Sequence, residues 1–72
     1  MDKHILKDKI GKDTYEKLEK IVLLANKKKL TKEEFGLAYQ GLYERAMKHS
    51  NSDDQITSTL GYIYLNVMRH YQ

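Results

Sequence analysis

Residues 55–68 have the sequence QITSTLGYIYLNVM, fourteen residues without a charge in a chain that is 32% Asp, Glu, Lys and Arg. Such a run has to be covered, either by the rest of the chain or by a partner. On a helix, which turns about 100° per residue, its apolar positions fall on two nearly opposite sides. The first side is a normal core face, made of Ile56, Leu60, Ile63, Tyr64, Val67 and Tyr71. The second consists of Gly61, Leu65 and Met68, flanked by Ser58, Tyr62 and Arg69.

The second side of this helix has two interpretations. In the first, the other helices surround the last one, so that Leu65 and Met68 contact the first long helix or the N-terminal segment. In the second, these two residues belong to the interface of a symmetric dimer, in which Gly61 and Ser58 let two backbones approach closely. Both interpretations predict that only a thin polar strip of this helix faces water.

Helical spacing of apolar residues continues along the whole chain, which has no proline and no Asn-Gly or Asp-Gly hairpin signal. Three segments begin with the same chemistry, a capping side chain followed three residues later by Glu or Gln. The pairs are Asp13 with Glu16, Thr31 with Glu34, and Ser52 with Gln55. We therefore expect helices near residues 13–26, 31–49 and 53–71.

The first two of these helices each have one apolar face. From helix 13–26 we expect core residues Tyr15, Leu18, Ile21, Val22 and Ala25. From helix 31–49 we expect Phe35, Ala38, Tyr39, Leu42, Tyr43, Ala46 and Met47. Glycine in a helix interior costs about 1 kcal/mol relative to alanine, so Gly36 and Gly41 are expected to mark the close approach of another backbone.

The N-terminal residues also have two interpretations. Residues 3–10 can form a short helix, capped by Asp2 and ended by Gly11 in a left-handed conformation. The alternative is a loose, extended arm. Together with the three longer helices, this predicts an all-α fold with a single helical domain over residues 1–72. The expected architecture is a small antiparallel three-helix bundle, with a short fourth helix at the N-terminus if the first interpretation holds.

Several classes of function are disfavoured by the residues that are present. The chain has no cysteine, so neither a disulfide nor a thiolate metal site can form. His4, His49 and His70 lie far apart in sequence, and none has a second ligand at helical spacing. No phosphate-binding loop, nucleophile elbow or metal-binding His-Glu pair occurs. We therefore expect no catalytic residues, no metal, no cofactor and no small-molecule substrate.

The composition also bears on location. The N-terminal residues lack the uninterrupted hydrophobic region of a signal peptide, and the neutral run is shorter than the roughly 20 residues that cross a bilayer. We therefore expect a cytoplasmic protein without membrane contact. Eleven lysines against two arginines, with many Tyr, Ile and Asn residues, suggest the AT-rich coding of a low-GC bacterium or its phage.

The positive charge lies mainly in the first half of the chain. Residues 1–34 hold ten Lys against seven Asp or Glu, a net charge of +3, whereas residues 35–72 hold three basic and three acidic residues. The cluster Lys27–Lys29 suggests nucleic-acid binding as an alternative function, of the transcriptional-regulator type. However, Glu33, Glu34 and Glu44 stand among the basic residues of the second long helix and would repel phosphates.

Protein–protein interaction is the function that these features favour. We expect a small non-enzymatic helical protein that binds another protein, as an adaptor, inhibitor or regulator, or that binds itself as a homodimer. Tyrosine combines a large apolar ring with a hydroxyl that can face water, which suits an interface. The candidate partner-binding residues are Leu37, Gly61, Tyr62, Leu65, Met68 and Arg69.

Overall fold

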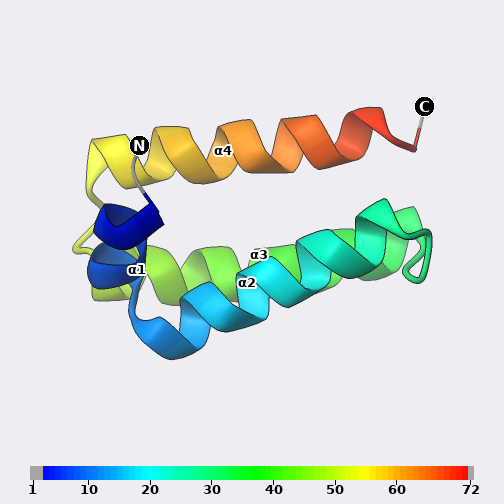
Figure 1. Ribbon diagram of the computed structural model, residues 1–72. Coiled ribbons are helices and arrows are strands. Elements are labelled where there is room, and N and C mark those ends of the chain that lie inside the picture. Colours follow the sequence, from blue (N-terminus) through cyan, green and yellow to red (C-terminus); the bar gives the residue numbers. More distant parts are fainter. Residues whose placement is uncertain (1–2, 72) are drawn as a thin grey trace.

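The computed structural model describes residues 3–71, which form four helices joined by turns (Figure 1). The helices are α1 (Lys3–Ile10), α2 (Lys12–Asn26), α3 (Lys32–His49) and α4 (Asp54–Arg69). The all-α prediction is confirmed, and the N-terminal segment is a helix rather than an extended arm. Helix α3 runs antiparallel to α2 and α4, and the short α1 packs at one end of the bundle (Figure 1). The structure thus packs four helices together.

Helix α3 begins as its sequence predicts. The Thr31 hydroxyl accepts a hydrogen bond from the Glu34 amide (3.1 Å), and the Thr31 amide donates to Glu34 Oε1 (2.9 Å). Each side chain thereby satisfies a backbone donor that has no partner inside the helix. The capping box at this position is confirmed.

Helix α4 begins one residue later than predicted, and its cap is not Ser52. Asp53 Oδ1 accepts from the amides of Gln55 (2.8 Å) and Ile56 (3.3 Å). Both Asn51 and Ser52 have a left-handed backbone, with φ of 57° and 59°. An N-cap residue usually has an extended backbone, so the cap moves to the next side chain that can accept.

Helix α2 also differs from the prediction at its start. Asp13 was expected to be the cap, but the helix begins at Lys12 and its N-cap is Gly11, with no hydrogen bond from a capping side chain. Gly11 has a φ of 91°, which glycine adopts without strain. It ends α1, as predicted, and also starts α2. The predicted cap of α1, Asp2, lies outside the described residues.

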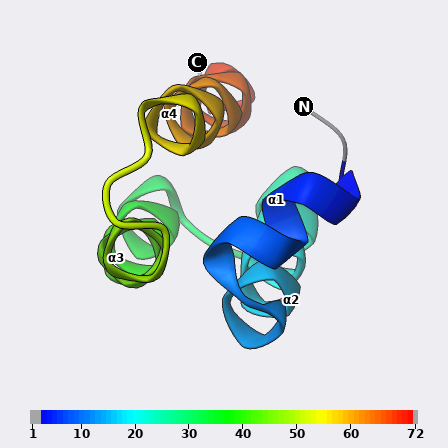
Figure 2. The same ribbon diagram turned by 90° about the vertical axis from the view of Figure 1, so that its left-hand side faces the viewer.

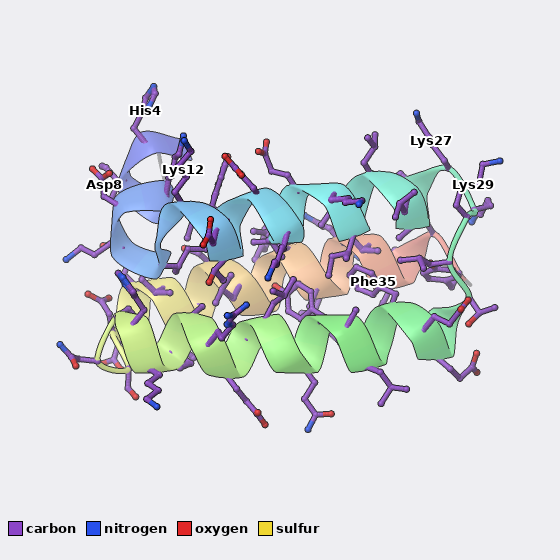
Figure 3. All side chains as sticks on the ribbon, turned by 90° about the horizontal axis from the view of Figure 1, so that it is seen from below. His4, Asp8, Lys12, Lys27, Lys29 and Phe35 are labelled. Atoms are coloured by element: carbon purple, nitrogen blue, oxygen red, sulfur yellow. The ribbon has the colours of Figure 1, made fainter. Side chains whose placement is uncertain are left out.

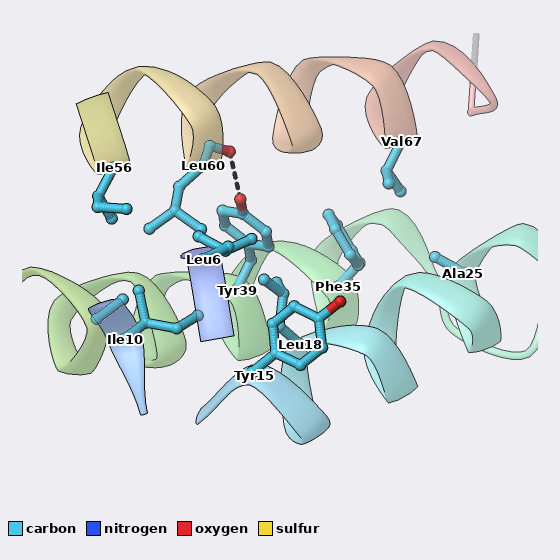
Figure 4. Packing of buried hydrophobic residues seen from close by; sticks show 11 residues of the cluster. Leu6, Ile10, Tyr15, Leu18, Ala25, Phe35, Tyr39, Ile56, Leu60 and Val67 are labelled. Carbon is cyan, nitrogen blue, oxygen red and sulfur yellow. Dashed lines mark hydrogen bonds between the residues drawn. The ribbon is translucent and has the colours of Figure 1, made fainter. Parts of the chain in front are cut away.

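The core draws on all four helices (Figure 4). Its buried apolar residues are Leu6 and Ile10 of α1; Tyr15, Leu18 and Ala25 of α2; Phe35, Tyr39 and Ala46 of α3; and Ile56, Leu60 and Val67 of α4. Every one of these in the three long helices lies on the face predicted to be inside. The Tyr39 hydroxyl donates to the Leu60 carbonyl and so fastens α3 to α4. The rings of Phe35, Tyr39 and Tyr64 pack together, with centroids 5.1 to 6.0 Å apart.

The other end of the bundle is held by contacts between the α2–α3 turn and the end of α4. The Tyr71 hydroxyl donates to the Leu30 carbonyl (3.0 Å). The Lys28 ammonium donates to the His70 carbonyl and lies 5.2 Å from the centroid of the Tyr71 ring. Cations are favourable near helix C-termini and over aromatic faces. One residue of the basic cluster therefore has a structural role.

Candidate protein-interaction surface

The two apolar sides of α4 have different surroundings. Its inner side holds the buried residues Ile56, Leu60 and Val67. On its outer side, Leu65 is 61% exposed and Tyr62 is 68% exposed. Figure 2 shows the reason: α2 and α3 lie on the same side of α4, and α1 does not reach over it. The interpretation in which the chain itself covers Leu65 is therefore wrong.

Met68 occupies an intermediate position. It is half-buried and packs against the core. Met68 lies close to α3: a Cβ built on Gly36 of that helix would be 4.0 Å from Met68 Cε. The expected contact of Met68 with the first long helix or the N-terminal segment is thus replaced by a contact with α3.

A shallow groove runs between α3 and α4, on one side of the exposed residues. It consists of two adjoining cavities of about 290 and 550 Å³, which share Gly36, Gln40 and Tyr64. We call it the α3/α4 groove. Gly61 and Tyr43 also line it, and at its far end lie Met68 and Leu37, the latter 74% exposed.

Gly36 and Gly41 were expected to mark the close approach of another backbone, but no other helix backbone of the described residues packs closely against either of them. Among the atoms of residues 3–71, a Cβ built on Gly41 or Gly61 would have no neighbour within 4 Å, and one on Gly36 would meet only the end of Met68. Gly36 and Gly61 instead leave the α3/α4 groove open. Since glycine exposes backbone that another chain can approach, the groove has the shape that a partner helix would require.

A second groove lies on the other side of α4, between α4 and α2. We call this cavity of about 430 Å³ the α2/α4 groove. Its lining is mostly apolar and comes from three helices: Leu6 of α1; Tyr15, Leu18, Glu19 and Val22 of α2; and Thr59, Tyr62 and Ile63 of α4. Tyr62 therefore belongs to this groove, whereas Leu37 belongs to the α3/α4 groove.

The contribution of α2 to this surface was not predicted. The sequence contained a signal for it: residues 21–24 are Ile-Val-Leu-Leu, which point in all directions around a helix. One buried stripe cannot use all four: Val22 lines the α2/α4 groove, and Leu23, outside the groove, is 53% exposed. Such a run predicts that part of the helix lies at an apolar boundary.

The predicted site residues are thus partly brought together. Gly61, Leu65 and Met68 are spaced by three and four residues, so they are neighbours on the surface of α4. Together with Tyr62 they form what we call the α4 ridge, which separates the two grooves. Arg69 is exposed in the last turn of α4, four residues after Leu65. Leu37 lies apart from the ridge, on α3.

Comparison with known proteins gives no relative: the chain matches no protein-family model, no curated protein and no solved structure. Within residues 3–71, none of the helices combines the length and apolarity needed to span a bilayer. In the same part of the chain, no three His, Asp or Glu side chains lie close enough together to hold a metal ion.

Proposed function

We propose that this chain is a non-enzymatic protein-interaction module, an adaptor, inhibitor or regulator, whose α4 ridge binds another protein or a second copy of itself. The observation that carries this proposal is the exposure of Leu65 and Tyr62 on a helix whose opposite side already supplies the core. Apolar residues in water gain about 25 cal/mol for each Å² that a partner covers. Because the fold does not cover them, a partner can.

The shape of the surface supports a helical partner. A helix binds a groove by placing apolar residues at every third or fourth position into it. The α4 ridge is flanked by two such grooves, one lined by Gly36 and Gly61 and the other by Leu18, Val22 and Ile63. An added helix in either groove would pack against α4 and complete the coverage of its apolar surface.

The proposal is tested with Leu65→Asp, which places a charge on the ridge without entering the core. Ile5→Asp is the matched control, because Ile5 is 49% exposed on α1, away from the ridge. In light scattering after size exclusion, a homodimer formed through the ridge dissociates with Leu65→Asp and persists with Ile5→Asp. If the wild type is a monomer, affinity capture from a low-GC bacterial lysate replaces this readout. The proposal fails if Leu65→Asp leaves both readouts unchanged.

Nucleic-acid binding is the second candidate, and the exposed Lys27 and Lys29 at the α2–α3 turn favour it. Binding through phosphate contacts falls steeply as salt concentration rises. Retention on DNA that depends on salt and decreases in Lys27→Gln and Lys29→Gln would support this candidate. Retention on DNA that changes neither with salt nor in these two variants would rule out nucleic-acid binding through this turn.

A further inference from the structure

A second feature of the structure lies at the end of the bundle where α1 meets α2. It is an open cavity of about 610 Å³ between the first turn of α2 and the last turns of α3. The residues that matter for its chemistry are Gly11, Asp13, Thr14, Arg45, Lys48 and His49. None of them belongs to the α4 ridge or its grooves, so this site is independent of the function proposed above.

Thr14 is the polar residue that the fold buries, at 8% exposure, and it lines this cavity. The hydroxyls of the other threonines all have partners: Thr31 accepts from Glu34, and Thr57 and Thr59 donate to carbonyls four residues earlier. The Thr14 hydroxyl makes no such hydrogen bond within residues 3–71, and the residue four positions before it belongs to α1 rather than to α2.

The Thr14 hydroxyl is not sealed from solvent. Within residues 3–71, no side-chain oxygen or nitrogen that is sealed from solvent lacks a hydrogen-bond partner. Since the Thr14 hydroxyl has no hydrogen-bond partner among residues 3–71, it must touch open space. The open space that Thr14 lines is this cavity.

Three backbone donors lie beside this hydroxyl. The first hydrogen bond inside α2 runs from the Tyr15 amide to the Gly11 carbonyl (2.9 Å), so the amides of residues 12–14 precede it. Gly11 has no side chain to accept from them, whereas α3 and α4 are capped by Thr31 and Asp53. Unpaired amides at a helix N-terminus carry partial positive charge and favour anions.

Positive side chains complete the cavity from α3. Arg45 and Lys48 line it, against the single carboxylate of Asp13. Lys48 lies in the last turn of α3, where a cation stabilises the helix C-terminus. Arg45 lies before that turn, so helix stabilisation does not account for its positive charge beside the cavity. Lys12 also lines the cavity, but its side chain extends away from α3 (Figure 3), so its ammonium does not stand with Arg45 and Lys48.

His49 closes the cavity at the Gly11 end. Its Nδ1 lies 2.9 Å from the Lys9 carbonyl, which can only accept, so Nδ1 donates this hydrogen bond. The other ring nitrogen, Nε2, would lie 3.4 Å from a Cβ built on Gly11. A side chain at position 11 would therefore crowd this end of the cavity.

We propose that this cavity binds a phosphate group, either as free phosphate or as the monoester of a small molecule. The Thr14 hydroxyl and the amides of residues 12–14 donate to its oxygens, and Arg45 and Lys48 balance its charge. Arginine is suited to this role because its planar fork of N–H donors matches phosphate oxygens.

Nuclear magnetic resonance of the full ¹⁵N-labelled chain tests this proposal. Inorganic phosphate and glycerol phosphate are titrated separately, with chloride at matched ionic strength as the reference. The amides of residues 12–14 should shift in a saturable way with at least one phosphate and not with chloride. The tighter of the two ligands identifies the source of the phosphate group.

Variants separate a site from diffuse attraction. Thr14→Val keeps the shape and removes the hydroxyl, and it should weaken phosphate binding by about tenfold, as should Arg45→Gln. Arg69→Gln removes the other arginine, which lies in the last turn of α4 and does not line the cavity, and it should leave phosphate binding unchanged. If Thr14→Val does not fold, Thr14→Ser, which keeps the hydroxyl, should bind like the wild type while Arg45→Gln does not. The absence of saturable shifts, or equal losses in Arg45→Gln and Arg69→Gln, would overturn the proposal.

Discussion

On the inner face of α4, Ile56, Leu60 and Val67 are almost completely removed from water, whereas on its outer face Leu65 and Tyr62 remain largely exposed. Both faces are apolar, and both follow the helical repeat. They differ only in that α2 and α3 lie on one side of α4 (Figure 2). An apolar helix face is therefore a core face only where the rest of the chain can reach it. The inner face stabilises the fold, and the outer face is available to a partner.

The largest effect is expected on the inner face. Leu60 is one of the largest fully buried side chains, so Leu60→Ala leaves a cavity and should lower the free energy of unfolding by about 3 kcal/mol. Leu65→Ala, the same change on the outer face, should lower it by less than about 0.5 kcal/mol. Urea unfolding of both variants measures the difference. Similar losses would mean that the two faces do not differ as described.

A smaller effect is expected from the hydrogen bond between the Tyr39 hydroxyl and the Leu60 carbonyl. Tyr39→Phe should lower the free energy of unfolding by about 1 kcal/mol. Tyr62→Phe, which removes an exposed hydroxyl on the outer face, is the control and should change it little. A loss in the control as large as in Tyr39→Phe would contradict the assignment of Tyr39 to the core and of Tyr62 to the outer face of α4.

The same tyrosine should make stability depend on alkaline pH. Burial, together with the nearby Tyr43 and Tyr64, raises the pKa of Tyr39 above the ordinary tyrosine value. A raised pKa means that the unfolded chain loses this proton first, so the stabilising contribution is complete below about pH 10 and is lost as pH rises further. Denaturation of wild type and Tyr39→Phe between about pH 9 and pH 11 tests this. The variant should lose less stability over that interval.

The smallest effect, of opposite sign, is expected in the α3/α4 groove. Gly61→Ala meets no atom within 4 Å and should raise the free energy of unfolding by up to about 1 kcal/mol, because alanine is the better helix former. Gly41→Ala should give a similar gain, since its surroundings are equally open. Of these two glycines Gly61 lines the groove and Gly41 does not, so Gly61→Ala but not Gly41→Ala should weaken the binding of a partner that occupies the groove. Thermal unfolding and a binding assay together check both parts.

Much of the fold could be predicted from local sequence. The capping box of Thr31 and Glu34 and the buried residues of the long helices follow from spacing and side-chain chemistry alone. The starts of α2 and α4 could not be predicted in the same way. They depend on the positive φ of Gly11, Asn51 and Ser52. The predicted cap residues, Asp13 and Ser52, therefore lie two residues and one residue away from the observed caps.

The candidate site was predicted less completely, for a different reason. The helical repeat identified Leu65 and Tyr62 as an apolar outer side, but it could not show whether α1 or α2 would cover them. That depends on the angle at which the helices pack, which the spacing does not contain. The same limit explains the glycines of α3: Gly36 was expected at a close helix contact and instead lines an open groove.

Thiol accessibility can measure the coverage of each face of α4 separately, because the chain has no cysteine of its own. Leu65→Cys and Val67→Cys place one thiol on each face of α4, two residues apart, and their alkylation rates are compared in a dilute, monomeric sample. We predict that the thiol at position 65 reacts nearly as fast as in the unfolded chain, while the thiol at position 67 is strongly protected. Equal protection at both positions in the monomer would show that the outer face of α4 is covered by the chain itself, and would contradict this account.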